Sequence, residues 1–471
     1  MAHSLSAATG QPGGEFEHAF SRTKFTIRSG EGGMTQSSEC GGERAEERAA
    51  YAIGSGAHAY GYLIQVGDHL FQSPLSYYTN RRAWDMAPGY ERSPDPDFSR
   101  PVTEECVLCH AGKPLPVRDT LNRYEARPFA AEGIGCERCH GPAAEHLRKP
   151  PLGTIVNPAK LSGAARDSVC EECHLTGEIR VPNPGKTVAD YQPGRTLEDA
   201  YTIYVRARGD GQAIKVVSHS EQLARSACAR NSGGKLWCGT CHDPHEAPAN
   251  TVAYHRERCL SCHGATLVKS HGAPSRDCVG CHMPRKPASD GGHTVFTDHR
   301  ISRRPERESE SDAKGELTAW REPAARLRER NLAIALATEG MQNAAPEEAI
   351  RGYRLLNRVE KEFPDDAAVL TNLGSVLLRA KQPAEAARRF EKAASLRPDS
   401  APYQVNAAAA LREESDLVDA ARRLERAVEL DPLLEAAVEA LARVYRDQGR
   451  DGKANEVEAR FRLAMRYRQA R

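Results

Sequence analysis

The sequence predicts a mainly α-helical protein in two parts: an irregular first part with a small β-hairpin, and an α-solenoid after it. Three observations lead to this prediction. All 14 cysteines and all 17 histidines lie before residue 300. The stretch from Arg300 to about Arg330 is charged and poor in apolar residues, which is typical of a solvated connector. Beyond it, Pro364, Pro398 and Pro432 recur every 34 residues, and a repeat of this period indicates stacked helical pairs.

Composition and charge limit the class of protein. The chain has 471 residues, 39% of them apolar, which suits two or three packed domains. The chain has 65 basic and 64 acidic side chains and no block of like charge. Its charge therefore gives no reason to predict binding to nucleic acid or to an anionic membrane surface. No run of about 18 apolar residues exists, so no membrane span is predicted within the chain. We expect a first domain over residues 1–300, a charged linker over 301–329 and a repeat domain over 330–471.

The first 105 residues contain Gly and Ser clusters and alternating apolar runs. The clearest run extends from Tyr60 to Tyr78, with Gly67 and Asp68 between two alternating segments. A Gly-Asp pair in that position favours a tight turn, so this run predicts a β-hairpin.

The 34-residue units each contain two amphipathic helices joined by a short turn. The apolar positions of two successive units are Leu370, Leu373, Gly374, Leu377, Ala386, Phe390 and Ala393, then Ala407, Ala408, Leu411, Ala420, Leu424 and Ala427. Over about 140 residues the chain here resembles the tetratricopeptide repeat family, which implies that small and large residues interlock neighbouring helices. An opening unit with Ala349 and Tyr353, and a final unit with Leu441 and Tyr445, fit less well, as expected of units that cap a stack.

Twelve of the cysteines form six pairs, each with two residues between the cysteines, and a histidine follows every pair at once. The pairs are Cys106/Cys109, Cys136/Cys139, Cys170/Cys173, Cys238/Cys241, Cys259/Cys262 and Cys278/Cys281, followed by His110, His140, His174, His242, His263 and His282. The pattern Cys-x-x-Cys-His attaches c-type haem. The two thiols form thioethers with the haem vinyl groups, and the histidine ligates the iron. Zinc ribbons and disulfides also use paired cysteines, but neither needs a histidine at the next position.

Six covalent haems explain why the motif region has little helical periodicity. From Cys106 to His282 there are 177 residues for six motifs, or about 30 residues each. The porphyrins must therefore lie against one another and form much of the apolar interior. We expect an irregular, haem-packed multihaem cytochrome domain.

The second axial ligand distinguishes an electron carrier from a catalyst, because a haem with histidine on both faces has no open site. Eleven histidines lie outside the motifs, enough for all six haems. His146 and His245 follow motif histidines too closely to reach around the same porphyrin, so either would have to ligate a neighbouring haem. The six preferred distal ligands are His58, His146, His219, His245, His293 and His299.

Complete bis-histidine ligation favours electron transfer, and two other functions remain open. One is an enzyme that acts on a small nitrogen or sulfur compound at a haem with an open position. Such enzymes often replace the motif histidine of that haem with lysine, whereas all six motifs here end in histidine. The other is a scaffold in which the haems are mainly structural. We expect the repeats to dock a redox partner protein, although a rigid spacer or an oligomerisation surface would use the same repeats.

Several stretches also resemble bacterial multihaem cytochromes c that carry tetratricopeptide repeats, a family related to the tetrahaem cytochromes that accept electrons from hydroxylamine oxidoreductase. They are CERCHGPAAEH from Cys136, NPAKL from Asn157, GKLWCGTCHDPH from Gly234, DCVGCHMPRK from Asp277 and HTVFTDHRI from His293. The resemblance implies electron transfer. It also implies a further CxxCH motif shortly before a segment like the MAHS at the start of this chain. The chain is then a mature form, a truncated form or one with a misassigned Met1, and we favour truncation. If the gene extends upstream, we expect a seventh haem with His3 or His18 as a ligand near it.

The compartment follows from the chemistry of haem attachment. Cytochrome c maturation takes place outside the bacterial cytoplasm, so a periplasmic or otherwise extracytoplasmic protein is expected. The N-terminus MAHSLSAATGQPGGEF has no charged segment followed by an apolar one, so the export signal is absent from this chain. Cys40 and Cys228 lie outside the motifs, and the sequence permits either a disulfide between them or two free buried thiols.

Overall fold

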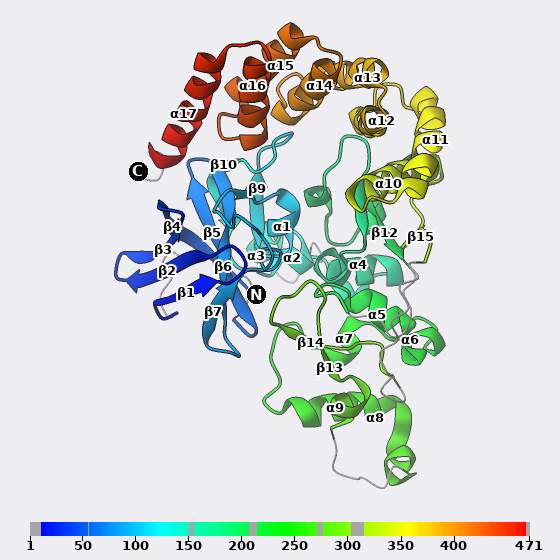
Figure 1. The fold of residues 1–471 in the computed structure, drawn as a ribbon. Coiled ribbons are helices and arrows are strands. Elements are labelled where there is room, and N and C mark those ends of the chain that lie inside the picture. Colours follow the sequence, from blue (N-terminus) through cyan, green and yellow to red (C-terminus); the bar gives the residue numbers. More distant parts are fainter. Residues whose placement is uncertain are drawn as a thin grey trace.

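The computed structural model describes residues 11–54, 56–149, 155–206, 214–270, 277–302 and 315–467, except for the side chains of residues 265–270, 466 and 467. Figure 1 shows a twisted antiparallel sheet at the N-terminal end, a central region of short helices and loops, and an arc of helices at the C-terminal end. No helix in the described part of the chain is both long enough and apolar enough to cross a membrane.

The N-terminal sheet is a meander in which β1 to β7 pair antiparallel in chain order, with β8 beside β6. Trp84 on β7 brings the first and last strands of the meander together. Its indole nitrogen donates a hydrogen bond of 2.8 Å to the Pro12 carbonyl. The strands are β1 Gly14–His18, β2 Thr23–Gly30, β3 Gly33–Cys40, β4 Glu43–Ile53, β5 Ala59–Val66, β6 His69–Tyr78, β7 Ala83–Met86 and β8 Arg100–Pro101.

The predicted hairpin is confirmed. Strands β5 and β6 pair antiparallel, with Val66 opposite His69, and Gly67 and Asp68 form the turn between them. A second tight connection, which the sequence analysis did not identify, joins β3 to β4. There Gly41 and Gly42 have φ angles of 60° and 88°, which glycine adopts without a steric penalty.

The expectation of a mainly α-helical chain with one small hairpin is wrong for this region, because the hairpin belongs to an eight-stranded sheet. The strand hardest to predict is β4, whose sequence ERAEERAAYAI is rich in helix formers. Pairing with β3 and β5 overrides that local preference, and Ala49 and Ala52 become buried with Phe25 and Tyr62 in the core of the sheet.

The central region consists of short helices, single 3₁₀ turns and small sheets. Strand β9 pairs with β10, β13 with β14, and β12 lies between β11 and β15. The helices are α1 Glu104–Leu108, α2 Glu137–His140, α3 Ala144–Arg148, α4 Gly163–His174, α5 His219–Arg225, α6 Ala227–Asn231, α7 Cys238–Cys241, α8 Thr251–Ser270 and α9 Cys278–His282, and the strands are β9 Lys113–Pro116, β10 Tyr124–Ala131, β11 Ile179–Pro182, β12 Tyr201–Arg206, β13 Arg285–Pro287, β14 Val295–Thr297 and β15 Leu317–Ala319.

Part of the expected connector is folded. Residues 303–314 lie outside the described residues, but β15 pairs with β12 and buries Leu317. Next to it, Trp320 donates to the Glu171 carboxylate at 2.9 Å. The expectation of a solvated connector therefore fails for this stretch, because two apolar side chains within it pack against the central region.

The C-terminal helices pack in chain order and form an arc (Figure 1). Pro364, Pro398 and Pro432 lie in the loops after α11, α13 and α15. We call residues 328–467 the helical array. Its helices are α10 Arg328–Gln342, α11 Pro346–Glu362, α12 Ala367–Arg379, α13 Pro383–Leu396, α14 Ala401–Glu413, α15 Leu417–Leu430, α16 Glu435–Asp447 and α17 Asp451–Tyr467.

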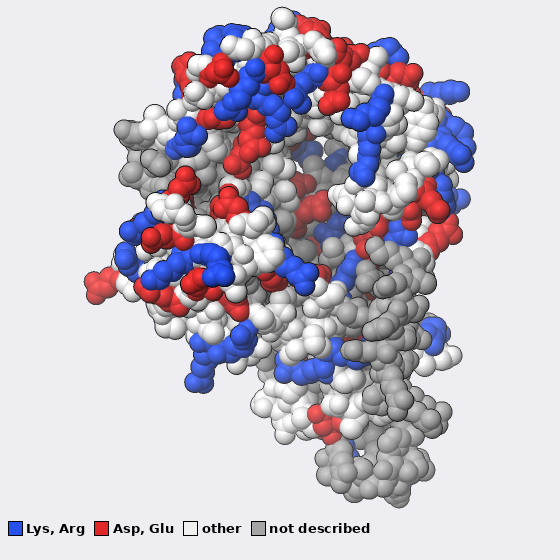
Figure 2. Space-filling view, in the orientation of Figure 1, with Lys and Arg blue, Asp and Glu red and all other residues white. Residues whose placement is uncertain are grey.

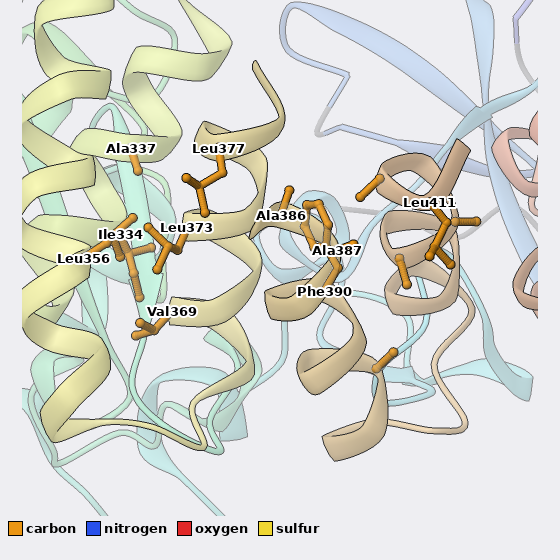
Figure 3. Packing of buried hydrophobic residues seen from close by; sticks show 14 of the residues in the cluster. Ile334, Ala337, Leu356, Val369, Leu373, Leu377, Ala386, Ala387, Phe390 and Leu411 are labelled. Atoms are coloured by element: carbon orange, nitrogen blue, oxygen red, sulfur yellow. The ribbon is translucent and has the colours of Figure 1, made fainter. Parts of the chain in front are cut away.

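The apolar positions predicted in the two successive units are buried, whereas Ala349 and Tyr353 of the opening unit are only partly buried. Figure 3 shows Leu373 and Leu377 of α12 and Phe390 of α13 in the core cluster. The phenyl ring of Phe390 packs directly against Gly374. A larger residue at position 374 would clash with it, because its Cβ would lie 2.8 Å from Phe390 Cε1. Small and large residues thus interlock where the repeat pattern predicts.

Polar contacts connect the array to the preceding regions at both of its ends. Near α10, the buried Arg330 pairs with Asp366 at 2.8 Å and donates to the Pro182 carbonyl. Near α16, His69 Nε2 lies 2.8 Å from Asp431 Oδ1, and both side chains are buried. Lys, Arg, Asp and Glu are interspersed over the face in Figure 2, in keeping with a net charge near zero.

We predict that Phe390→Ala lowers the free energy of unfolding by about 3 to 5 kcal/mol, because it removes a buried ring and leaves a cavity beside Gly374. Urea unfolding followed by far-UV circular dichroism measures this change. Val418→Ala on α15 is the matched control, since Val418 is 75% exposed and should change stability by less than about 0.5 kcal/mol. Equal effects of the two substitutions would contradict the packing described for the array.

Candidate functional site

The Cys-x-x-Cys-His motifs lie on or at the ends of short helices in the central region. The second, fourth and sixth coincide with α2, α7 and α9. The first extends beyond α1, the third ends α4, and the fifth lies within α8. Residues i and i+3 share one face of a helix, so a helical turn lets both thiols of a pair reach the same edge of a porphyrin.

Thiols of different motifs lie close together. Hydrogen bonds link Cys109 to Cys173, Cys170 to Cys238 and Cys259 to Cys278. The first of these contacts, together with the nearby Arg180, lowers the pKa of Cys109 to about 6 and raises that of Cys173. In Figure 1 α4, α7, α8 and α9 follow one another away from the helical array. These contacts join the first, third and fourth motifs into one group and the fifth and sixth into another, and α7 of the fourth motif contacts α8 of the fifth.

The second half of the fifth motif departs from the expected packed interior. Cys262, predicted to attach haem, is exposed, and so is the predicted iron ligand His263 that follows it. Cys262 Sγ accepts a hydrogen bond of 3.9 Å from the adjacent Ser261 hydroxyl, whereas Cys259 is partly buried beside Cys278. The role predicted for Cys262 in haem attachment stays a prediction. The other exposed motif cysteines are Cys106, Cys136 and Cys281.

Arg138 joins three motifs through the residues between their cysteines. It lies between Cys136 and Cys139, and its guanidinium contacts the Leu108 carbonyl of the first motif at 2.7 Å and the Glu172 carboxylate of the third at 2.8 Å. Glu172 is 2% exposed. Burial raises its pKa to about 7, although Arg138 acts to lower it. This contact holds three predicted haem-attachment segments together.

Two motif histidines have one ring nitrogen directed at a backbone carbonyl. His140 Nδ1 lies 2.7 Å from the Val156 oxygen, and His282 Nδ1 lies 2.9 Å from the Ser302 oxygen. A proton on Nδ1 leaves the lone pair on Nε2, which is the form that ligates a metal ion. Their surroundings therefore suit the proximal role that the sequence predicts for them.

Three of the six predicted distal histidines lie beside motif histidines. The ring of His245 is 5.9 Å from His140 with an interplanar angle of 20°, and His299 is 6.2 Å from His242 with an angle of 29°. His219 is 5.1 Å from His174. Two imidazoles on opposite faces of one metal ion, each bonded at about 2.0 Å, have ring centroids roughly 6 Å apart. The first two pairs match that separation, so the residues present fit iron ligation.

Two of the other predicted distal histidines, His58 and His293, have different neighbours in the described part of the chain. The ring of His58 packs 4.9 Å from Phe296, and burial lowers the pKa of its imidazole. His293 Nε2 lies 2.9 Å from the Asp85 carboxylate, so that nitrogen already has a partner. His146 is on α3.

His255 is a candidate ligand that the sequence analysis did not select. Its ring lies 5.5 Å from His242. Its position one helical turn before Cys259 on α8 is the signal that could have identified it.

Two spare histidines instead have structural partners on both ring nitrogens. His18 contacts Ser21 and the Glu91 carbonyl, and His69 lies between Asp68 and Asp431. His3 and His271 lie outside the described residues.

The two cysteines outside the motifs are free and lie in different regions. Cys40 is exposed at the end of β3, and Cys228 is partly buried on α6. Neither alternative left open by the sequence describes them, because they are not bonded to each other and Cys40 is not buried.

The last three motifs lie in a segment with almost no apolar core. Among the described side chains from Lys215 to Ser302, Ala288 is the only buried apolar one, whereas seven polar or charged side chains are buried. Ordering each residue costs about 1 to 2 kcal/mol of backbone entropy. One buried methyl group cannot offset that cost, so the chemistry of the segment fits a large apolar group attached to it.

Residues 82–141, which include the first two motifs, match the family described as cytochrome c554 and c-prime. The chain is also 25% identical over 220 residues to the multiheme cytochrome MtrA of Shewanella baltica, which covers 43% of this chain and 59% of MtrA. It is 24% identical over 221 residues to the dissimilatory sulfite reductase MccA of Wolinella succinogenes, which covers 39% of this chain and 27% of MccA. The chain therefore spans less than two thirds of either relative.

Among solved structures, one titled "MamA MSR-1 C2" is 21% identical, with a TM-score of 0.26, and covers 30% of this chain and 77% of that chain. The family match and the two curated relatives, together with the motifs, support a multihaem cytochrome with covalently bound haem c.

We predict that Arg138→Leu destabilises the haem-loaded protein by about 3 kcal/mol, because it leaves Glu172 buried without its ion-pair partner. Chemical unfolding followed by visible circular dichroism measures the loss. Arg148→Leu is the matched control near the same motif, since its pair with Glu145 is exposed and should be worth less than about 1 kcal/mol. If both variants unfold at the same denaturant concentration, Arg138 does not join the motifs as described.

Proposed function

We propose that this protein is an extracytoplasmic multihaem cytochrome c that passes electrons through six closely packed bis-histidine haems, and that the helical array docks a redox partner protein. The observation that carries the proposal is the segment from Lys215 to Ser302, which contains three motifs and a single buried apolar side chain among those described. Covalent porphyrins supply the missing apolar surface there. The location outside the cytoplasm follows from the compartment in which haem c is attached.

Each group of residues has one role in this proposal. The cysteine pairs anchor the haems through thioether bonds, and the histidine after each pair is the proximal ligand. The distal ligands are drawn from His58, His146, His219, His245, His293 and His299, with His255 as a further candidate. When bound, the haem iron supplies a one-electron redox couple, which bis-histidine ligation keeps closed to exogenous ligands.

Close spacing of the motifs favours transfer from haem to haem. Contacts between thiols of the first and third, third and fourth, and fifth and sixth motifs leave no room for a separate domain between them. Arg138 adds the second motif to this series. Electrons would therefore move through neighbouring cofactors rather than across long protein gaps.

A cavity beneath the array supports partner docking. It has a volume of about 550 Å³, and Arg118, Lys186, Phe363, Arg397 and Tyr403 are among its lining residues. Figure 2 shows the surface hollowed between the array and the central region. Pockets for small ligands occupy about 300 to 1,000 Å³, so the cavity is large enough to receive a side chain of a partner.

The alternative is an oxidoreductase that acts on a small sulfur or nitrogen compound at one haem with an open position. The similarity to MccA, whose name describes a dissimilatory sulfite reductase, favours a sulfur oxyanion within that alternative. All six motif histidines are present, so an open position would have to arise from a missing distal ligand.

We predict that the chain, expressed with an export signal and intact haem-maturation machinery, carries six haem equivalents by mass spectrometry. Its ferric EPR spectrum should contain only low-spin signals, because every iron has two imidazole ligands. Substitution of both cysteines of one motif, such as Cys278→Ala with Cys281→Ala, is the control and should remove one haem equivalent. A mass equal to the bare polypeptide would refute the proposal, and a high-spin signal altered by sulfite would favour the oxidoreductase.

A further inference from the structure

The segment from His242 to His245 contains two imidazoles in a short turn. The side chain of His245 is 71% exposed, and its Nδ1 lies 3.4 Å from Asp243 Oδ1. His242 completes the fourth motif, and His245 follows three residues later. The His245 backbone N–H donates to Asp243 Oδ1 at 2.8 Å, and Pro244 restricts the backbone between them. Because each residue spans at most about 3.5 Å, the Cα atoms of the two histidines lie within roughly 10 Å of each other.

The ring of His245 faces the histidine of a different motif. It lies 5.9 Å from the ring of His140 in the second motif, and the two planes differ by 20°. His140 Nδ1 is directed at the Val156 oxygen, which leaves the Nε2 lone pair for a metal ion. The separation is that of two imidazoles on opposite faces of one iron, roughly 6 Å.

His242 has other histidines beside it, so His245 is not needed there. The ring of His255 lies 5.5 Å away at an interplanar angle of 70°, and that of His299 is closer to parallel. His299 lies 6.2 Å from His242 with an interplanar angle of 29°. Two hydrogen bonds position it: His299 Nδ1 contacts the Thr297 oxygen at 2.9 Å, and its backbone N–H donates to Gln222 Oε1 at 2.8 Å.

We infer that the four residues from His242 to His245 ligate two different irons: His242 is the proximal ligand at the fourth motif, and His245 is the distal ligand of the haem at the second motif. The inference rests on the proposed function. His140 and His242 are 102 positions apart in the sequence, yet this turn makes the second and fourth haems neighbours. It gives the haem series a direct connection that does not pass through the third haem.

The test uses the full, haem-loaded chain with His245→Gly. One of the six haems should become high-spin in the ferric EPR spectrum while the mass still contains six haems, and added imidazole should return it to low spin. His299→Gly is the comparator and should produce one high-spin haem at the fourth motif. A His245→Gly protein whose haems all remain low-spin would overturn the inference.

A variant that lacks the second haem shows which haem loses its distal ligand when His245 is replaced. The double variant Cys136→Ala, Cys139→Ala lacks the second haem, so His245→Gly should add no high-spin signal to it, whereas His299→Gly still should. A high-spin signal from His245→Gly in that background would mean that His245 ligates another iron, and the inference fails. Wild-type protein without any covalent haem would refute the proposed function instead, so the two failures are distinct.

A ligand exchange gives the same assignment if the haem-deleted protein does not accumulate. His140→Met should raise the reduction potential of a single haem, because methionine ligation raises the potential relative to histidine. Combined with His245→Gly, the haem with the raised potential should itself become high-spin. Two separately altered haems in the combined variant would overturn the inference.

Discussion

In our proposal, the segment from Lys215 to Ser302 depends on contact with a large apolar group, because its described residues bury only one apolar side chain. From Lys215 to Ser302 the described chain buries Ala288 together with polar residues such as Gln222, Asp298 and Arg300. In our proposal porphyrins occupy the role that leucine and valine have in an ordinary core. The short helices are then best understood as supports for pairs of thiols and imidazoles.

The helical array differs from that segment because apolar protein side chains fill its core. Its side chains form a core in which small residues such as Gly374 accept large ones such as Phe390, and this core continues into Val181 and Tyr204 of the central region. It is tied to the rest of the chain by polar contacts at its two ends, through Arg330 near α10 and Asp431 near α16. Apolar contacts add to this attachment, since Leu433 packs with Val66 and Phe71 of the N-terminal sheet. The array can therefore hold in place the chain segments that carry the motifs.

Charged residues between the motif cysteines bring segments together that are far apart in the sequence. Arg138 contacts two other motifs, and Glu171 of the third motif accepts a hydrogen bond from Trp320. The turn from His242 to His245 extends this arrangement to the ligands, since it places one imidazole beside His140. The order of the haems in space therefore need not follow the order of the motifs in the chain.

The sequence alone determined the features that arise from local patterns. The CxxCH spacing specifies the chemistry because five consecutive residues hold all the protein groups that attach one haem, and the 34-residue proline period and the Gly67-Asp68 turn are equally local. Tertiary structure decided what depends on partners distant in the chain. Strand β4 has the composition of a helix and becomes a strand through its pairing with β3 and β5, and β15 pairs with β12, which is distant in the sequence. The partners of His140 and His242 were likewise beyond sequence reasoning, because a histidine is a distal ligand only if folding brings it to the opposite side of an iron, and no local pattern encodes that approach.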